Sequence, residues 1–554
     1  MVNIRVGITF LCSFSLVFAA FTDSKRSQHH ISGEAKAKFP DLYEAGVTEL
    51  QAGLDAGLFN SVDLVKAYFA RIDETSFLNA VLEKNPSALA EAAVLDKERR
   101  SSGKRSLLHG IPILLKDNIA TIASEGMNTT AGSFSLLGSV VPEDAGVVKR
   151  LRKAGAIILG KANLSEFAHF RGNLPSGWSG RGGQNTNAYF PNADPCGSSS
   201  GSGVAASIGL VTVTLGSETD GSITCPSSNN NAVGIKPTVG LTSRAGVIPI
   251  SANQDTIGPI TRSVSDAAIV LSVIAGKDPN DNFTLAQPDT VPDLTKNLDV
   301  NALKGKRIGV PRAVFFTPGF NDPSVVAAFE EALKTIESLG ATVVDPADLP
   351  SAAEIRRSNN ETIVLDVDFK VQLDAYYQAL VENPSGVRSL ADLIAFNDAN
   401  PELEEPVNFT DQSELIAAEA TVGFDSNYTQ ALAFNHELGR TRGIDAALQE
   451  HNLDALVLPA TGLTTTPAAI AGYPIVTVPL GFFPDNVTIE SAGPLTVYPA
   501  PGVPFGLSFF GTAFSEFDLV GFAFAYEQKT KTRLARKAFA AAIPKTQLAD
   551  VMQY

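Results

Sequence analysis

The chain contains few cysteines and histidines for its length. Its 554 residues include 3 Cys and 6 His. Cys12 lies in an apolar N-terminal segment, so the rest of the chain keeps Cys196 and Cys225, too few for the disulfide framework of a small secreted protein. These two thiols can pair or stay free, and we expect two buried free thiols. Neither a Cys/His cluster nor a His-Glu-x-x-His segment is present, so we expect no metal site and no cofactor.

Positive charge is also scarce. The chain has 43 Lys and Arg against 59 Asp and Glu, a formal net charge of -16. An excess of negative charge repels a polyanion. We therefore expect no nucleic-acid partner.

Long apolar runs are absent after residue 20. The one near the start, Val6 to Ala20, follows Arg5 and ends in the small-residue site Val17-Phe18-Ala19. It is too short to span a bilayer comfortably and is typical of a cleaved secretory signal. We predict a signal peptide over residues 1–19, a polar segment over 20–40, and a secreted protein with no stable membrane insertion.

Asn-x-Ser/Thr sequons agree with a secreted glycoprotein, although a Ser/Thr-rich chain contains some by chance. The one at Asn163 lies in an apolar stretch, where we expect a buried and unmodified side chain. The sequons begin at Asn128, Asn163, Asn282, Asn360, Asn408, Asn427 and Asn486.

Residues 41–545 have the pattern of a single α/β domain. Helical patterns dominate 41–100, with apolar spacing over 42–58, a cap at Asn60 or Ser61 for the next helix, and an alanine-rich helix that ends at Gly103. Short apolar runs then alternate with helical patterns, which predicts a layered fold with a largely parallel sheet. Residues 285–450 indicate a helical insert, after which strand signals return at 454–460, 474–483 and 506–511.

A loop rich in glycine and serine, residues 195–203, stands between well-patterned segments. It contains Gly-Ser-Ser-Ser-Gly, a formal match to the nucleophile elbow that would make Ser199 a nucleophile. The segment before it carries two prolines and favours turns, whereas an elbow directly follows a strand. We therefore exclude an elbow here.

A second turn, residues 216–222, directly follows a strand-like run. Backbone N–H groups of such a turn can converge on one point, as a tetrahedral oxyanion requires, and Ser222 lies beside them. None of the six histidines lies in a segment that resembles a triad loop. Lys116 can replace histidine as the base, because it ends an apolar run and burial lowers the pKa of a lysine.

Three segments together resemble the amidase signature family: GIPILLKDNI around Lys116, CGSSSGSG around Ser198, and GSETDGSITCP around Ser222. The likeness extends from about residue 45 to 540. Within the family, the chain resembles secreted fungal and plant amidases. It implies a single α/β domain in which a twisted mixed sheet is covered by helices on both faces.

The resemblance also assigns roles to residues. Lys116 would be the base, Ser198 would relay the proton from a cis peptide, and Ser222 would attack the carbonyl and form an acyl-enzyme. The oxyanion donors would be the backbone N–H groups of Thr219, Asp220, Gly221 and Ser222. The reaction would be hydrolysis of a small-molecule carboxamide to an acid plus ammonia or an amine.

The chain departs from the family pattern near the nucleophile. Asp220 stands where glycine is common, and Thr224 replaces a frequent arginine, so a carboxylate is added near the site. Three alternatives stay open: an esterase with the same residues, a non-enzymatic binding protein on the same scaffold, and the glutaminase subunit that amidates charged tRNA, which needs cytosolic partners. The sequence does not indicate the amide, whose pockets we expect from residues 120–180 and 285–450, nor the oligomeric state.

Overall fold

The computed structural model describes residues 39–315, 322–460 and 462–552. The predicted signal peptide, with Cys12, lies outside the described residues, as does most of the polar segment. From Phe39 onward the chain forms a compact unit. None of the helices in the described part is long and apolar enough to cross a membrane.

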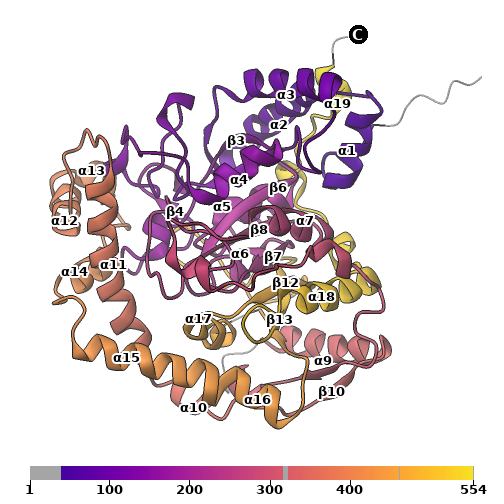
Figure 1. Ribbon diagram of the computed structural model, residues 1–554, viewed down its shortest axis with the longest axis vertical. Helices are drawn as coiled ribbons and strands as arrows, with labels where there is room; N and C mark the ends of the chain where they lie inside the picture. Colours follow the sequence, from indigo (N-terminus) through magenta and orange to yellow (C-terminus); the bar gives the residue numbers. More distant parts are fainter. Residues whose placement is uncertain (1–38, 316–321, 461, 553–554) are drawn as a thin grey trace, which may run out of the picture. The chain divides into compact units, whose positions relative to one another are not determined.

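An eleven-stranded mixed sheet runs through the described residues (Figure 1), in the order β1-β3-β2-β6-β8-β7-β12-β13-β11-β9-β10. The pairs β3–β2, β2–β6, β11–β9 and β9–β10 are parallel, and the other neighbours are antiparallel. The strands are β1 Val81–Lys84, β2 Pro112–Lys116, β3 Ile157–Ala162, β6 Val213–Glu218, β7 Val233–Lys236, β8 Thr256–Thr261, β9 Arg307–Gly309, β10 Thr342–Val344, β11 Ala455–Pro459, β12 Ile475–Phe482 and β13 Pro504–Phe510.

The mixed sheet confirms what the family resemblance implied and corrects the pattern-based expectation of a largely parallel one. An apolar run shows that a strand is buried, but it carries no information on the strand's direction. A separate two-stranded sheet joins β4, Trp178–Ser179, to β5, Gly183–Gln184.

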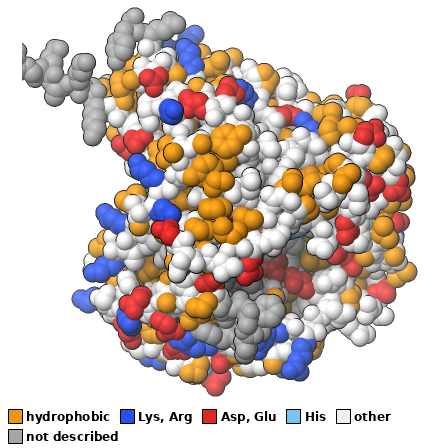
Figure 2. Space-filling view, turned by 180° about the vertical axis from the view of Figure 1, so that it is seen from behind, with side chains coloured by type: hydrophobic (Ala, Val, Ile, Leu, Met, Phe, Trp, Pro, Cys, Tyr) orange, Lys and Arg blue, Asp and Glu red, His pale blue; other side chains and the backbone are white. Residues whose placement is uncertain are grey.

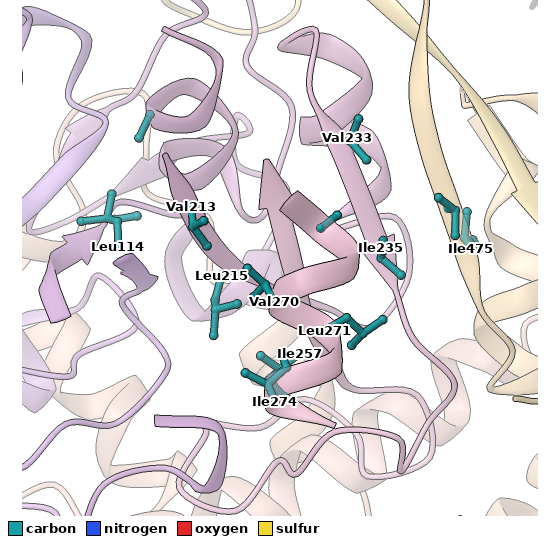
Figure 3. Close-up of a cluster of buried hydrophobic side chains, with 14 of the residues drawn as sticks. Leu114, Val213, Leu215, Val233, Ile235, Ile257, Val270, Leu271, Ile274 and Ile475 are labelled. Atoms are coloured by element: carbon teal, nitrogen blue, oxygen red, sulfur yellow. The ribbon is translucent and has the colours of Figure 1, made fainter. Parts of the chain in front are cut away.

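Helices cover both faces of the sheet. On β6, the Thr214 hydroxyl donates to the Ser202 carbonyl of α5, Ser200–Ser207, at 3.2 Å. Because side chains alternate along a strand, the neighbouring Val213 and Leu215 point to the opposite face. There they meet α7, Val264–Ile274 (Figure 3). α6, Thr224–Asn229, packs beside α5, whereas α4, Gly146–Ala154, and α18, Glu516–Thr530, pack with α7.

The N-terminal helices follow the sequence signals closely. The first, α1, is shorter than the predicted 42–58 and covers Val47–Asp55. Asn60 caps α2, Ser61–Glu74, as predicted: its side chain accepts from the Asp63 N–H, and the Asp63 carboxylate accepts from the Asn60 N–H, both at 3.0 Å. The third helix, α3, covers Ala88–Ser102 and ends at Gly103, whose φ of +83° suits glycine.

The segment predicted as a helical insert is only partly so. Its first third contributes β9 and β10 to one edge of the sheet, and these three-residue strands are too short to stand out in the sequence. Helices α11 to α15 line one side of the sheet region (Figure 1). The helices from here to the C-terminus are α8 Arg312–Phe315, α9 Pro323–Ser338, α10 Ala352–Ile355, α11 Asn360–Ala379, α12 Leu390–Ala399, α13 Pro401–Glu404, α14 Ser413–Glu419, α15 Ser426–His436, α16 Asp445–Glu450, α17 Thr466–Ala471, α18, and α19 Leu548–Val551.

Candidate active site

Two parallel strands bring the predicted base and the predicted nucleophile to the same edge of the sheet. Lys116 is the last residue of β2, which pairs in parallel with β6. β6 ends at Glu218, and the turn with Ser222 follows directly. Because the carboxyl ends of parallel strands meet at one edge, segments 106 residues apart in sequence come to the same edge of the sheet.

The Lys116 side chain is fully buried and surrounded by serine oxygens. Its Nζ lies 2.7 Å from Ser198 Oγ, 2.9 Å from Ser217 Oγ and 3.1 Å from the Ser217 carbonyl oxygen. Burial lowers the pKa of Lys116 to about 7, although the nearby carboxylates of Asp255 and Glu218 favour the charged form. Burial therefore favours the neutral amine of this lysine.

The loop before α5 carries Ser198, whose side chain is completely buried. The Gly197–Ser198 peptide bond is cis, the conformation that the family resemblance implied. The next residue, Ser199, connects this loop to the turn of residues 216–222, which carries the predicted nucleophile and is called the nucleophile turn below. The Ser199 N–H donates to the Ser222 carbonyl at 3.2 Å. The Ser199 hydroxyl donates to the Ser217 carbonyl at 3.1 Å. Ser199 is the serine of the formal elbow match, and its hydroxyl connects two segments of the backbone.

A buried carboxylate that the sequence analysis missed holds the nucleophile turn. Glu218 accepts from the backbone N–H groups of Gly221 at 3.0 Å, Ile223 at 2.7 Å and Thr224 at 2.7 Å. The expectation for Gly221 as an oxyanion donor is therefore not met, since its N–H is bonded to Glu218. The other three expected N–H groups have no acceptor in the described part of the chain: Thr219, Asp220 and Ser222.

The two cysteines form a disulfide, so the prediction of free thiols was wrong. The Cα atoms of Cys196 and Cys225 are 5.8 Å apart, across 29 residues of sequence. The loop that carries Ser198 packs against the first turn of α6, and this brings the two sulfurs together. The sequence could have given a hint, because each cysteine lies two or three residues from a predicted catalytic serine.

A cavity of about 590 Å³ opens on Ser222. One wall comes from the loop Phe167–His169, whose three residues all have left-handed backbone with φ of 47°, 56° and 75°. Other lining residues come from α11 and α14, so both segments expected to form pockets contribute. Figure 2 shows one face of the molecule hollowed, with acidic side chains inside the hollow. The lining residues are Ala168, His169, Phe170, Gly172, Asn173, Gly197, Thr219, Asp220, Ser222, Ile250, Thr362, Leu365 and Glu414.

Comparison with known proteins assigns the family. The family model described as Amidase matches residues 63–520 of this chain. The chain belongs to the amidase family. As an amidase it is a hydrolase that acts on carbon–nitrogen bonds other than peptide bonds. This activity agrees with a cavity lined by Ser222 and with the buried Lys116.

Relatives of this amidase come from fungi, plants and bacteria. It is 44% identical over 524 residues to a putative amidase of Arthroderma benhamiae, which covers 90% of this chain and 88% of the relative. It is 43% identical to a probable amidase of Arabidopsis thaliana, with 90% and 92% covered. Among solved structures, the native peptide amidase of Stenotrophomonas maltophilia matches with a TM-score of 0.80 and 45% identity, covering 91% of this amidase and 99% of that chain.

Proposed function

We propose that this amidase works through an acyl-enzyme on Ser222. One observation carries the proposal: a buried lysine with a pKa lowered to about 7 lies 2.7 Å from the Ser198 hydroxyl oxygen. That hydroxyl belongs to the loop bonded to the Ser222 carbonyl, and Ser222 lines the cavity. Activation of a serine requires a base of this kind.

The proton path follows from these neighbours. Neutral Lys116 takes the Ser198 proton, Ser198 takes the Ser222 proton, and the Ser222 oxygen bonds to the amide carbon. The free N–H groups of Thr219, Asp220 and Ser222 stabilise the oxyanion. The protons then return to the leaving nitrogen as the C–N bond breaks, and water releases the acid by the same relay, so that amide plus water gives acid plus amine.

For the substrate we infer amides of peptides, one of the classes that the sequence leaves open. The support is the likeness to the peptide amidase of Stenotrophomonas maltophilia, which extends over 91% of this chain. A cavity of about 590 Å³ has room for a side chain and the backbone next to it.

Secretion is part of the proposal, and two features support it. A disulfide such as Cys196–Cys225 persists in oxidising compartments and is rare in the cytosol. The second feature is a set of four exposed sequons that would accept a glycan: Asn282, Asn408, Asn427 and Asn486. Two other sequons do not suit glycosylation, because Asn163 is fully buried, as expected, and the Asn128 side chain donates to Glu83.

The test measures turnover of a peptide amide and of the matching ester by the unmodified protein, Ser222→Ala and Lys116→Ala. We expect Ser222→Ala to lower kcat by about 10⁴-fold or more and Lys116→Ala nearly as much. For the unmodified protein, kcat/KM should rise with pH through about 7, because the neutral form of Lys116 is the base. A fluorophosphonate should add its mass to the peptide that contains Ser222.

Several outcomes would contradict these roles. Substantial amide hydrolysis by folded Ser222→Ala would exclude Ser222 as the nucleophile. A pH profile that is flat between about 5 and 9 would exclude a titrating base of the kind proposed. Turnover of the ester without the amide would favour the esterase alternative.

A further inference from the structure

The cavity beside Ser222 has an unbalanced set of charges. Among its lining residues are the carboxylates Asp220 and Glu414, and no lysine or arginine. Two more carboxylates lie next to them on α11, where Glu361 interacts with Asp220 and Asp366 with Glu414. Acidic groups therefore come from the nucleophile turn and from two insert helices that are distant in sequence.

These carboxylates keep open acceptor positions. Asp220 Oδ2 accepts from the Thr466 hydroxyl at 2.7 Å, and the Thr465 side chain also favours the charged form of Asp220, whereas no donor in the described residues meets hydrogen-bond geometry at the buried Oδ1. The buried Asp366 Oδ1 also has none. The Glu414 side chain makes neither a hydrogen bond nor an ion pair with another described residue. Buried acceptors without donors are costly, and a ligand that carries N–H donors removes that cost.

The two carboxyl groups next to Ser222 are those of Asp220 and Glu361, which interact with each other. Glu361 accepts from Gln254 Nε2 at 2.8 Å, and Gln254 also reaches the Thr219 carbonyl at 3.4 Å. Burial, together with the negative charge of Asp220, raises the pKa of Glu361 to about 8, and burial raises the pKa of Asp220. The two carboxyl groups therefore hold protons more tightly than free acids do, and a cation bound beside them would favour their charged forms.

We propose that this cavity selects amides that carry a protonated amine or guanidinium and rejects amides that carry a carboxylate. The inference rests on the proposed function, since it names the substrate class of the same site. It adds a consequence for the product: the carboxylate formed at Ser222 meets carboxyl groups and no lysine or arginine among the lining residues, which favours its release.

The experiment separates charge selection from chemistry. Binding of N-acetyl-lysinamide, N-acetyl-norleucinamide and the α-amide of N-acetyl-glutamate is measured by calorimetry on Ser222→Ala, which cannot form the acyl-enzyme. These side chains have similar lengths and differ in charge. We expect the lysine amide to bind about tenfold more tightly than the norleucine amide, and the glutamate amide about tenfold more weakly.

Two further substitutions on the Ser222→Ala background locate the effect. Glu414→Gln should lower the lysine-to-norleucine affinity ratio about threefold, since it removes one unpaired charge from the cavity wall. The matched control is Glu331→Gln on α9, an exposed glutamate that pairs with Lys334 and should leave the ratio unchanged.

Equal affinities for the three amides, or a ratio that Glu414→Gln does not lower, would overturn the proposal. Undetectable binding of the lysine amide would do so as well. A charge preference in Ser222→Ala without amide turnover by the unmodified protein would instead count against the acyl-enzyme function.

Discussion

Two regions beside the cavity are built in different ways. In the framework, which is the region of the lysine and serine motifs, Lys116, Ser198 and Glu218 are 1% exposed or less and hydrogen-bonded to close neighbours. In the insert wall, which is the part of the lining that comes from α11 and α14, the Glu414 side chain has no hydrogen-bond or ion-pair partner in the described chain. Val407 and Val422, which precede and follow α14, are 83% and 85% exposed. The framework thus holds its polar groups through hydrogen bonds, whereas the insert wall leaves a carboxyl group without one.

The insert wall is attached to the framework through a few buried carboxylates. Asp368 of α11 accepts from the Ser251 hydroxyl at 2.5 Å and from Asn253 Nδ2 at 2.8 Å. Glu404 of α13 accepts from the Ser133 hydroxyl at 2.8 Å and from the Phe134 N–H at 2.7 Å. Breaking framework contacts should therefore affect turnover, and breaking insert contacts should affect stability or selection.

The largest of the effects expected from this contrast concerns Glu218. Glu218→Gln removes the charge that holds three N–H groups of the nucleophile turn, and we expect kcat on a peptide amide to fall about 10²-fold with little change in KM. The matched control is Glu516→Gln, since Glu516 is also buried and accepts from a backbone N–H, that of Thr238, at 2.6 Å. Equal losses of kcat in both variants would mean that any buried carboxylate has this effect.

The disulfide should have a smaller effect on turnover. Cys196→Ala combined with Cys225→Ala releases the Ser198 loop from α6, and we expect a several-fold loss of kcat and a loss of about 2–4 kcal/mol in unfolding free energy. A dithiol reductant should lower kcat of the unmodified protein to the same level and leave the double variant unchanged. Full activity after complete reduction would show that the other bonds hold the framework alone.

The smallest effect is expected at the buried carboxylate pair that anchors the insert. The Glu166 Oε1 atom lies 2.6 Å from Arg171 Nη1. Burial, together with the nearby Glu404, raises the pKa of Glu166 from about 4.5 to about 8. The folded state then keeps a proton that the unfolded state releases, so stability declines as pH rises between these values. Glu404→Gln should reduce the decline by about 1–3 °C in Tm between pH 5 and pH 8.

The control for that measurement is Glu331→Gln, whose Tm should follow the unmodified protein at both pH values, because Glu331 is exposed on α9. An unchanged decline in Glu404→Gln would show that the coupling between the two carboxylates does not weaken the attachment of the insert.

Sequence reasoning predicted what short, contiguous segments encode. The strand ending at Lys116 and the cap at Asn60 each depend on neighbours within a few residues, and the structure has them where expected. It missed what depends on distance in space. The Cys196–Cys225 bond, the antiparallel centre of the sheet and the bonds of Glu218 arise only once separate segments pack together. The carboxylate of Asp220 was expected near the site, but that of Glu414 was missed for the same reason, since the two residues are 194 apart in sequence.

The surroundings of the lysine nitrogen also fix the direction in which a proton can move. An uncharged amine has two hydrogens and one lone pair. Ser217 offers Nζ two acceptors, its carbonyl oxygen at 3.1 Å and its hydroxyl oxygen at 2.9 Å. In the neutral form that we propose, an amine that donates both hydrogens to these oxygens directs its lone pair to the Ser198 hydroxyl at 2.7 Å, so the proposed base would be oriented to receive a proton before any substrate arrives.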